Sequence, residues 1–194
     1  MDDQAEQADS KQRLLDAAIA YIAGRGLGDL SLLQLAAAIG TSHRMLIYHF
    51  GSKEGLLVEV VRAVERQQRD ALAELDLDGD LTETELMRQM WKRLADPSLW
   101  AHERLFFEMY GQALQRRDHS VQLLDGVVDS WVGPVAAQLR RRHGVTPAAA
   151  RADARLRLAV IRGLLLDLLA TGDRAGVDRA MEQFIQLYAL QPAR

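Results

Sequence analysis

One stretch of the chain, IGTSHRMLIYHFGSKEGLL at residues 39–57, concentrates side chains that carry positive charge or donate hydrogen bonds. Its chemically useful members are His43, Arg44, Tyr48, His49 and Lys53. An arginine can donate two parallel hydrogen bonds to O6 and N7 of guanine. Hydroxyl, imidazole and ammonium groups bind phosphate oxygens. The chemistry that this stretch offers is therefore recognition of a nucleic acid.

Two short helices are predicted to position these side chains. Ser31 can cap a helix that ends at Gly40, and Ser42 can cap a second helix almost at once. Two such helices joined by a tight turn form a helix-turn-helix, whose second helix enters the major groove of DNA. Because Leu46 and Phe50 are four residues apart and can both face the core, the polar side chains lie on the outer face.

We interpret that outer face as a DNA-binding surface. The candidate contacts are Ser31, Thr41, Ser42, His43, Arg44, Tyr48, His49 and Lys53. Arg44 is the candidate for a guanine contact, His43 for a base edge or a phosphate, and the others for phosphates. Structural alternatives exist, because His49 can simply pack beside Phe50, and Arg44 and Lys53 can be solvated.

The segment SLLQLAAAIGTSHRMLIYHFGSKEGLL, residues 31–57, resembles the TetR family of bacterial transcriptional regulators. The family pattern is Gly-Val-Ser, three variable residues, Leu-Tyr-x-His-Phe, x-x-Lys and x-x-Leu. The residues that match it in register are Gly40, Ser42, Leu46, His49, Phe50, Lys53 and Leu56. The resemblance implies an all-α fold, with an N-terminal three-helix helix-turn-helix DNA-binding domain and a C-terminal helical ligand-binding and dimerisation domain. It also implies a repressor that a small molecule releases from a palindromic operator.

The segment departs from the family pattern at two positions. Thr41 stands where the family has a small apolar residue. Ile47 occupies the place of a common tyrosine that contacts a phosphate in the family, and Tyr48 follows one position later. One residue is about 100° around a helix, so Tyr48 cannot simply take over that contact. Ile47 can instead contact a thymine methyl group.

The rest of the chain is predicted to be helical, because it has four prolines and no alternating β-branched runs. Further helices are expected over about 10–23, 98–117, 120–142, 147–170 and 175–190, besides one that begins at Ser52 and one capped by Thr82 with Glu85. We expect a disordered acidic tail over 1–9, the helix-turn-helix domain over 10–55, a connecting helix and linker over 56–80, and the ligand-binding and dimerisation domain over 81–194.

The acidic run DLDGD at residues 76–80 spaces aspartates as a calcium-binding loop does. Leu81 stands where such a loop requires glycine, and Met87 where it requires glutamate. We therefore expect a solvated linker and no metal site.

Charge and composition permit a DNA-binding protein of the cytoplasm. The net charge is −3. Residues 10–55 nevertheless carry five basic side chains against three acidic ones, Lys11, Arg13, Arg25, Arg44 and Lys53 against Asp16, Asp29 and Glu54. The chain has no cysteine, so it needs no oxidising compartment. Charged residues interrupt its most apolar run, at 156–170, so we expect no membrane partner.

Two C-terminal helices are candidates for a homodimer interface. Residues 156–170 are apolar nearly all round, and a helix of that kind must be covered on more than one side. The candidate interface residues are Leu156, Val160, Leu164, Val177, Met181, Phe184 and Tyr188. Packing within one chain is the alternative. A dimer suits operator DNA, whose two half-sites lie one helical turn apart.

Aromatic and polar residues of the C-terminal part are candidates for a ligand pocket. They are Trp91, Trp100, His102, Arg104, Phe107, Tyr110 and Trp131, which fit an ordinary core equally well. We find no nucleophile paired with a base, no metal cluster and no phosphate-binding loop, so we expect neither an enzyme nor a cofactor. The alternative function is a helical small-molecule carrier or interaction protein with a non-functional DNA-binding motif.

Overall fold

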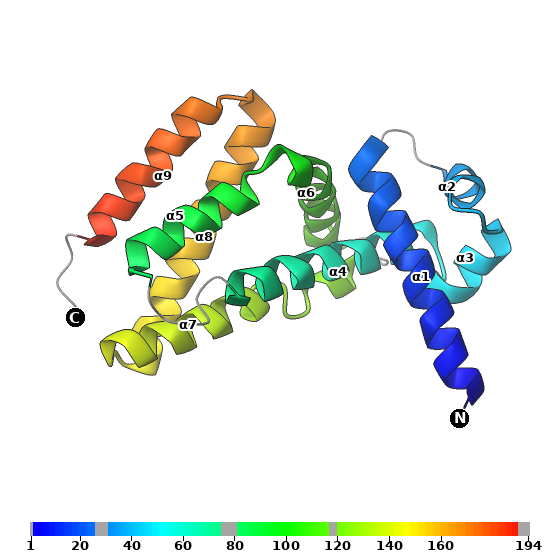
Figure 1. The fold of residues 1–194 in the computed structure, drawn as a ribbon, viewed down its shortest axis with the longest axis horizontal. Helices are drawn as coiled ribbons and strands as arrows, with labels where there is room; N and C mark the ends of the chain where they lie inside the picture. The colour runs from blue at the N-terminus through cyan, green and yellow to red at the C-terminus, as the bar shows by residue number, and fades with distance from the viewer. Residues whose placement is uncertain (1, 26–30, 75–80, 117–119, 190–194) are drawn as a thin grey trace. The chain divides into compact units, whose positions relative to one another are not determined.

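The computed structural model describes residues 2–25, 31–74, 81–116 and 120–189, which form helices joined by turns (Figure 1). The α-helices are α1 (Asp2–Arg25), α2 (Leu32–Ala38), α3 (His43–Phe50), α4 (Lys53–Glu74), α5 (Glu83–Leu94), α6 (Trp100–Leu114), α7 (Asp129–His143), α8 (Pro147–Thr171) and α9 (Arg174–Ala189). Short 3-10 helices occur at Pro97–Leu99 and Val121–Leu124. These ranges contain no strand, so the predicted all-α fold is confirmed. None of their helices has the length and apolar character needed to cross a membrane.

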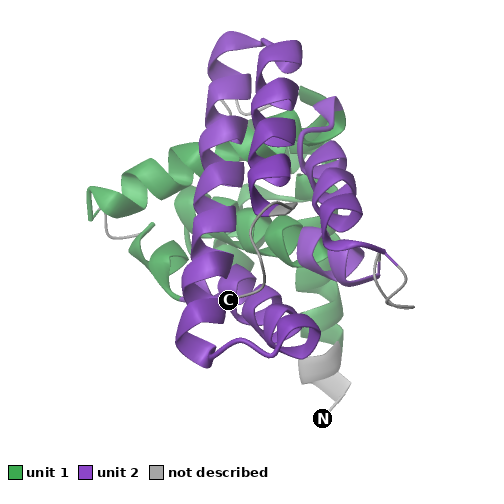
Figure 2. Ribbon diagram, turned by 90° about the vertical axis from the view of Figure 1, so that its left-hand side faces the viewer, with its two compact units in different colours: residues 1–67, 98–125 green, residues 68–97, 126–194 purple. Residues whose placement is uncertain are grey.

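The chain divides into two compact units, coloured separately in Figure 2. Unit 1 comprises residues 1–67 and 98–125, and unit 2 comprises residues 68–97 and 126–194. Helix α6 therefore belongs with the N-terminal helices, whereas the sequence assigned it to the C-terminal domain. The reason is its apolar face, on which Leu105, Phe106 and Met109 are buried in unit 1. The linker predicted at 76–80 lies outside the described residues.

Unit 1 is built around the N-terminal helices. The predicted stripe on α1 is buried at Leu15, Ala18 and Ile22. Helix α1 packs against α2 and α6, and α2 packs against α3. Leu35 of α2 and Leu56 of α4 are almost completely buried in the same unit. The core of unit 1 is therefore made by the apolar periodicity seen in the sequence.

Helix α1 begins at Asp2, within the stretch where the sequence predicted an acidic tail. Two contacts support this longer helix. Asp9 and Arg13 form an ion pair at 3.4 Å, four residues apart along α1. The side chain of Gln7 donates a hydrogen bond to the Tyr48 hydroxyl at 2.6 Å. The second contact joins residues 41 positions apart, which local sequence patterns do not reveal.

Side-chain caps define the starts of the predicted helices. Ser31 Oγ accepts a hydrogen bond from the Gln34 N–H at 3.1 Å, and the Gln34 side chain accepts one from the Ser31 N–H at 3.2 Å. Ser42 Oγ accepts from the Met45 N–H at 3.2 Å. Gly40, at φ +71°, makes the turn between these helices, a conformation that favours glycine. The predicted caps and the helix-turn-helix are confirmed.

Unit 2 contains α5, α7, α8 and α9. Helices α7 and α8 share a core of Val132, Ala136 and Leu139 against Ala150 and Ala154. Helix α9 packs on both α5 and α8. The predicted capping box at the start of α5 is confirmed, because the Thr82 N–H donates to the Glu85 carboxylate at 2.9 Å and Thr82 Oγ1 accepts from the Glu85 N–H at 3.3 Å.

The helix expected over 120–142 is shorter than predicted. Residues 121–124 form a 3-10 turn, and α7 begins only at Asp129. Gly126 separates them, with φ at +74°, which an α-helix does not accommodate. Pro134 lies inside α7 without breaking it. Its position in the second turn removes one helical hydrogen bond, which the packed α7–α8 face offsets.

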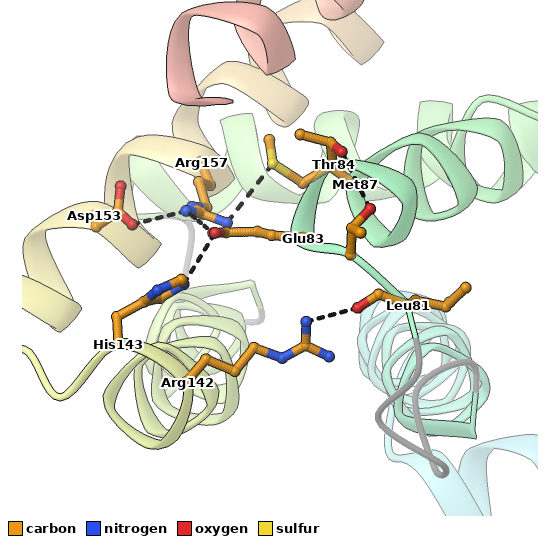
Figure 3. Close-up of polar contacts among 9 residues, drawn as sticks. Leu81, Glu83, Thr84, Met87, Arg142, His143, Asp153 and Arg157 are labelled. Carbon is orange, nitrogen blue, oxygen red and sulfur yellow. Dashed lines mark hydrogen bonds and ion pairs between the residues drawn. The ribbon is translucent and has the colours of Figure 1, made fainter. Parts of the chain in front are cut away.

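A buried arginine lies at the centre of the polar contacts of unit 2 (Figure 3). The side chain of Arg157 on α8 is ion-paired with Glu83 at the start of α5 and, at 2.9 Å, with Asp153. Its guanidinium lies 4.6 Å from the ring centre of Tyr188 on α9. Arg157 is only 7% exposed. One guanidinium on α8 therefore contacts side chains of both α5 and α9.

Neighbouring groups extend this cluster to α7. His143 Nε2 lies 3.0 Å from Glu83 Oε2, and Arg142 donates to the Leu81 carbonyl at 2.8 Å (Figure 3). Burial, together with the hydrogen bond to Asp153, raises the pKa of the Tyr188 hydroxyl. Tyr188 is therefore neutral, and its ring face attracts the Arg157 cation.

Candidate nucleic-acid interface

Helix α3 is fixed in unit 1 by its two apolar residues. Leu46 is 0% exposed and Phe50 is 9% exposed, as the four-residue spacing predicted. The helix packs against α2 across the turn at Gly40. The opposite side of α3 is thereby held toward solvent.

That opposite side carries the side chains most suited to DNA. His43 and Arg44 are exposed in the first turn of α3, and Tyr48 is 64% exposed one turn later. Arg44 therefore has the freedom needed for a bidentate contact with guanine. Ser42 is also exposed. Because its oxygen accepts the capping hydrogen bond, its O–H proton remains available to a phosphate oxygen.

The remaining predicted contacts lie around this face. Ser31 is exposed at the start of α2, whereas Thr41, His49 and Lys53 are half-buried. His49 lies between aromatic neighbours, with ring centres 5.0 Å from Tyr48 and 6.3 Å from Phe50. His49 Nε2 is buried and has no hydrogen-bond partner among the described residues. The packing role considered for His49 is therefore visible, and a phosphate contact remains a prediction.

Two residues of α1 contact this region and were not candidates from the sequence. Gln7 donates its hydrogen bond to Tyr48, and the Lys11 ammonium lies 5.5 Å from the ring centre of Phe50. They are four residues apart, so both project from one side of α1. A further step of four residues along α1 reaches Leu15, which is buried. The four-residue spacing from Leu15 back to Lys11 and Gln7 was the available signal.

Five of the seven ligand-pocket candidates belong to unit 1, all on α6. His102 is buried, and its Nε2 lies 3.3 Å from the Ile19 carbonyl oxygen of α1. Arg104 is exposed, with its guanidinium 5.8 Å from the ring centre of Trp100. Phe107 and Tyr110 are half-buried, and Phe106 packs against both rings.

His102 also lines a small cavity of about 10 Å³, together with Val60, Val61, Val64, Glu65, Glu103, Leu105 and Phe106. That volume accommodates about one water molecule. Drug-sized ligands occupy about 300–1,000 Å³. This cavity would therefore have to open before it could admit such a ligand.

The other two candidates, Trp91 and Trp131, belong to unit 2. Trp91 is buried, and its indole N–H donates to Asp178 Oδ1 at 2.6 Å. The guanidinium of Arg69 lies 5.6 Å from the ring centre of Trp131. These contacts fit the packing alternative that the sequence left open, and the ligand role stays a prediction.

The dimerisation candidates have different exposures within unit 2. Val177 and Met181 are buried against the chain's own helices, and Tyr188 contacts Arg157. Val160, Leu164 and Phe184 are half-buried. Leu156 is 52% exposed, and the structure adds Leu166 and Leu187 at 51% and 56%. The apolar residues that remain accessible for a partner therefore lie on the outer sides of α8 and α9.

We expect His102 to make the stability of unit 1 sensitive to acid. Burial lowers its pKa below the ordinary 6.5, despite the hydrogen bond with Ile19, so the unfolded chain takes up a proton before the folded chain does. The contribution of neutral His102 to the free energy of unfolding of unit 1 is present above pH 6.5. It is lost as the pH falls through the folded-state pKa.

The variant His102→Gln keeps an N–H donor for Ile19 and removes the titration. Urea unfolding of unit 1 should therefore lose less stability between about pH 7.5 and 5.5 in this variant than in the wild type. His43→Gln, at an exposed histidine, is the matched control and should behave as the wild type. Equal acid sensitivity in all three proteins would contradict this assignment.

The packing of α2 and α3, with exposed hydrogen-bond donors on α3, defines a helix-turn-helix, the motif whose second helix enters the major groove in DNA-binding proteins. Residues 14–60 match the bacterial regulatory proteins of the TetR family. This match assigns the helix-turn-helix region of the chain, residues 14–60, to the TetR type.

Individual proteins agree with this assignment. The regulator BetI of Cronobacter sakazakii is 35% identical over 63 residues, which are 32% of this chain and 31% of BetI, so the match spans less than a third of that relative. The regulator SrpR of Pseudomonas putida is 27% identical over 178 residues, covering 88% of this chain and 78% of SrpR. A Saccharomonospora viridis protein, described as a transcriptional regulator and solved in complex with choline, superposes with a TM-score of 0.67 at 22% identity, covering 93% of this chain and 95% of that one. At that identity the likeness concerns the fold.

Proposed function

We propose that this regulator is a cytoplasmic homodimeric repressor that binds a twofold-symmetric operator and is released from it by a small molecule. Residues 10–55 contact DNA, and residues 81–194 supply the ligand site and the dimer interface. The observation that carries the proposal is the α3 face, where Arg44 and Tyr48 are exposed around a helix fixed by Leu46.

On this proposal α3 enters the major groove. Arg44 binds O6 and N7 of a guanine, and His43 contacts a neighbouring base edge or phosphate. Ser31, Thr41, Ser42, His49 and Lys53 position the protein on the phosphates. Ile47, which is 38% exposed on the same helix, packs against a thymine methyl group.

The dimer interface is proposed on α8 and α9. Three leucines, Leu156, Leu166 and Leu187, expose more than half of their surface there. Burying such surface in a second copy is favourable. A twofold dimer also carries two recognition helices, one for each half-site of the operator. Such half-sites lie about 34–36 Å apart.

The ligand is proposed to be a small organic molecule, since a regulator of the same fold was solved with choline. Release requires that the ligand prefer the conformation that cannot bind DNA over the conformation that can. A ligand with equal affinity for both conformations would not shift the equilibrium between them. The aromatic residues of α6, Trp100, Phe107 and Tyr110, are the candidates for contacting it. A ligand that bound without changing operator affinity would contradict this part of the proposal.

The test of DNA recognition is selection of binding sites from a random duplex pool, followed by the variant Arg44→Ala. We expect a twofold-symmetric site, and a loss of about 1–3 kcal/mol in the variant with relaxed preference at one base pair. Arg151→Ala on α8, which removes the same charge elsewhere, is the control and should retain affinity. Uniform weakening on all sequences would make Arg44 a phosphate contact.

Failure to enrich any site at low salt would favour the alternative, a helical carrier or interaction protein. Salt separates the two functions as well. Operator affinity should fall steeply as salt rises, because each phosphate contact by a cation releases counterions. Binding of a neutral ligand by a carrier should hardly change.

A further inference from the structure

We propose that Gln7 is a positioning residue for DNA binding, which holds the Tyr48 hydroxyl so that its proton is donated to a backbone phosphate. The inference rests on the proposed operator binding. It assigns a role to the first turns of α1, outside the helix-turn-helix itself.

The contact is specific in its geometry. Gln7 Nε2 donates to the Tyr48 hydroxyl oxygen at 2.6 Å. Tyr48 is 64% exposed, so its hydroxyl is open to a partner from solvent or DNA. Its ring is further held edge-on against the His49 ring, at 74° between the planes. The ring and the hydroxyl are thus both restrained before DNA arrives.

Helix α1 is itself fixed at this end of α3. Lys11, one turn after Gln7, lies over the Phe50 ring at 5.5 Å. Leu15, one turn further, is buried in unit 1. The Gln7 side chain is therefore carried by a packed helix rather than by a free tail. The cost of ordering it is largely met when unit 1 folds.

The direction of the hydrogen bond decides what Tyr48 can do. A tyrosine hydroxyl has one proton to donate and lone pairs that accept, whereas a phosphate oxygen in DNA only accepts. Because Gln7 donates to the hydroxyl oxygen, the hydroxyl proton is left for the phosphate. A hydroxyl that accepts one hydrogen bond also donates the next one more strongly. Gln7 therefore orients and polarises Tyr48 toward the DNA backbone.

A carboxylate at position 7 should have the opposite effect. In Gln7→Glu the side chain has a similar shape but can only accept, so it takes the Tyr48 proton away from the phosphate. It also adds a negative charge, which repels DNA whether or not Tyr48 has its hydroxyl. Comparing Gln7→Glu with and without Tyr48→Phe separates these two effects.

The experiment is a double-mutant cycle on the full-length protein with its selected operator duplex. We expect Tyr48→Phe to weaken binding about tenfold, as for loss of a hydrogen bond to a charged group, and Gln7→Ala about three- to fivefold. Adding Gln7→Ala to Tyr48→Phe should weaken binding less than about twofold. Gln12→Ala, which removes another exposed glutamine hydrogen bond of α1, to Asp16, should bind as the wild type.

Salt dependence separates the loss of a neutral hydrogen bond from the loss of a cationic phosphate contact. Gln7 and Tyr48 are neutral, so their variants should lose affinity with the slope of log affinity against log salt unchanged. Lys53→Ala, which removes a charged contact, should reduce that slope by about 1. Unchanged thermal unfolding of Gln7→Ala would exclude loss of folding as the cause.

Three results would overturn the inference. One is an equal loss from Gln7→Ala in the wild-type and Tyr48→Phe backgrounds. A second is wild-type affinity in Gln7→Glu, which would mean that the glutamine accepts the Tyr48 proton. The third is an equal loss of operator affinity from Gln7→Glu in the wild-type and Tyr48→Phe backgrounds. Charge repulsion would then be the sole cause of that loss. If the wild-type protein selects no duplex at all, the proposed function fails instead, and the cycle is not reached.

Discussion

Replacing Arg157 with methionine is expected to lower the free energy of unfolding of unit 2 by about 3 kcal/mol. The guanidinium is 7% exposed and ion-paired with both Glu83 and Asp153. Removing it leaves the Glu83 and Asp153 carboxylates without their arginine partner. Both carboxylates keep roughly 30% of their side-chain surface exposed, so solvent screening places the expected loss at the lower end of the range for buried ion pairs.

Methionine is chosen because it retains volume beside Met87 and the Tyr188 ring. Native-state hydrogen exchange of the α8 amides would measure the loss in unit 2 directly, even if the two units unfold separately. The triple variant Arg157→Met, Glu83→Gln, Asp153→Asn is the control. It should recover much of the stability, because no buried charge is then left unpaired.

A further control is the exposed ion pair between Arg88 on α5 and Glu182 on α9, whose closest atoms are 2.7 Å apart. Arg88→Met should change stability much less than Arg157→Met, because water screens exposed pairs. Equal effects of the two substitutions would show that burial of Arg157 is not the source of its contribution.

The variant Leu46→Ala should destabilise unit 1 by about 3–4 kcal/mol and abolish operator binding. Leu46 is 0% exposed, so truncation loses its burial and leaves a cavity beneath α3. The recognition helix then lacks the contact that fixes its outer face. Hydrogen exchange of the α2 and α3 amides would report the loss of stability, and titration of the operator the loss of binding.

The neighbouring residue supplies the matched control for this second prediction. Ile47→Ala removes an aliphatic side chain from the same helix, but at a position that is 38% exposed. Its stability should stay within about 0.5 kcal/mol of the wild type, whereas its preference for a thymine in the operator should weaken. A stability loss in Leu46→Ala no larger than that in Ile47→Ala would contradict the assigned packing of α3.

Local chemistry explains why much of the fold was predictable. Ser31, Ser42, Thr82 and Thr146 cap their helices with side-chain hydrogen bonds that reach only three residues along the chain. The four-residue spacing of Leu46 and Phe50 likewise places them on one side of α3. Such interactions are contained within one helix or turn, so residue types and spacing are enough to predict them. The helix-turn-helix and its exposed face follow from them.

Contacts between distant segments were beyond that reasoning. The hydrogen bond of Gln7 to Tyr48 joins residues 41 positions apart, and that of His102 to Ile19 joins residues 83 apart. Val177 and Met181 have the same apolar character as Leu156, yet they are buried in their own unit, whereas Leu156 stays exposed.

The sequence by itself determined the helices, their caps and the polar face of α3, because those depend on neighbours a few residues away. Only the tertiary structure decided that α1 extends to contact Tyr48, that α6 packs with the N-terminal helices, and that Arg157 is buried between α5, α8 and α9. Periodicity shows which side of a helix is apolar, but the partner that covers it depends on how the whole chain packs.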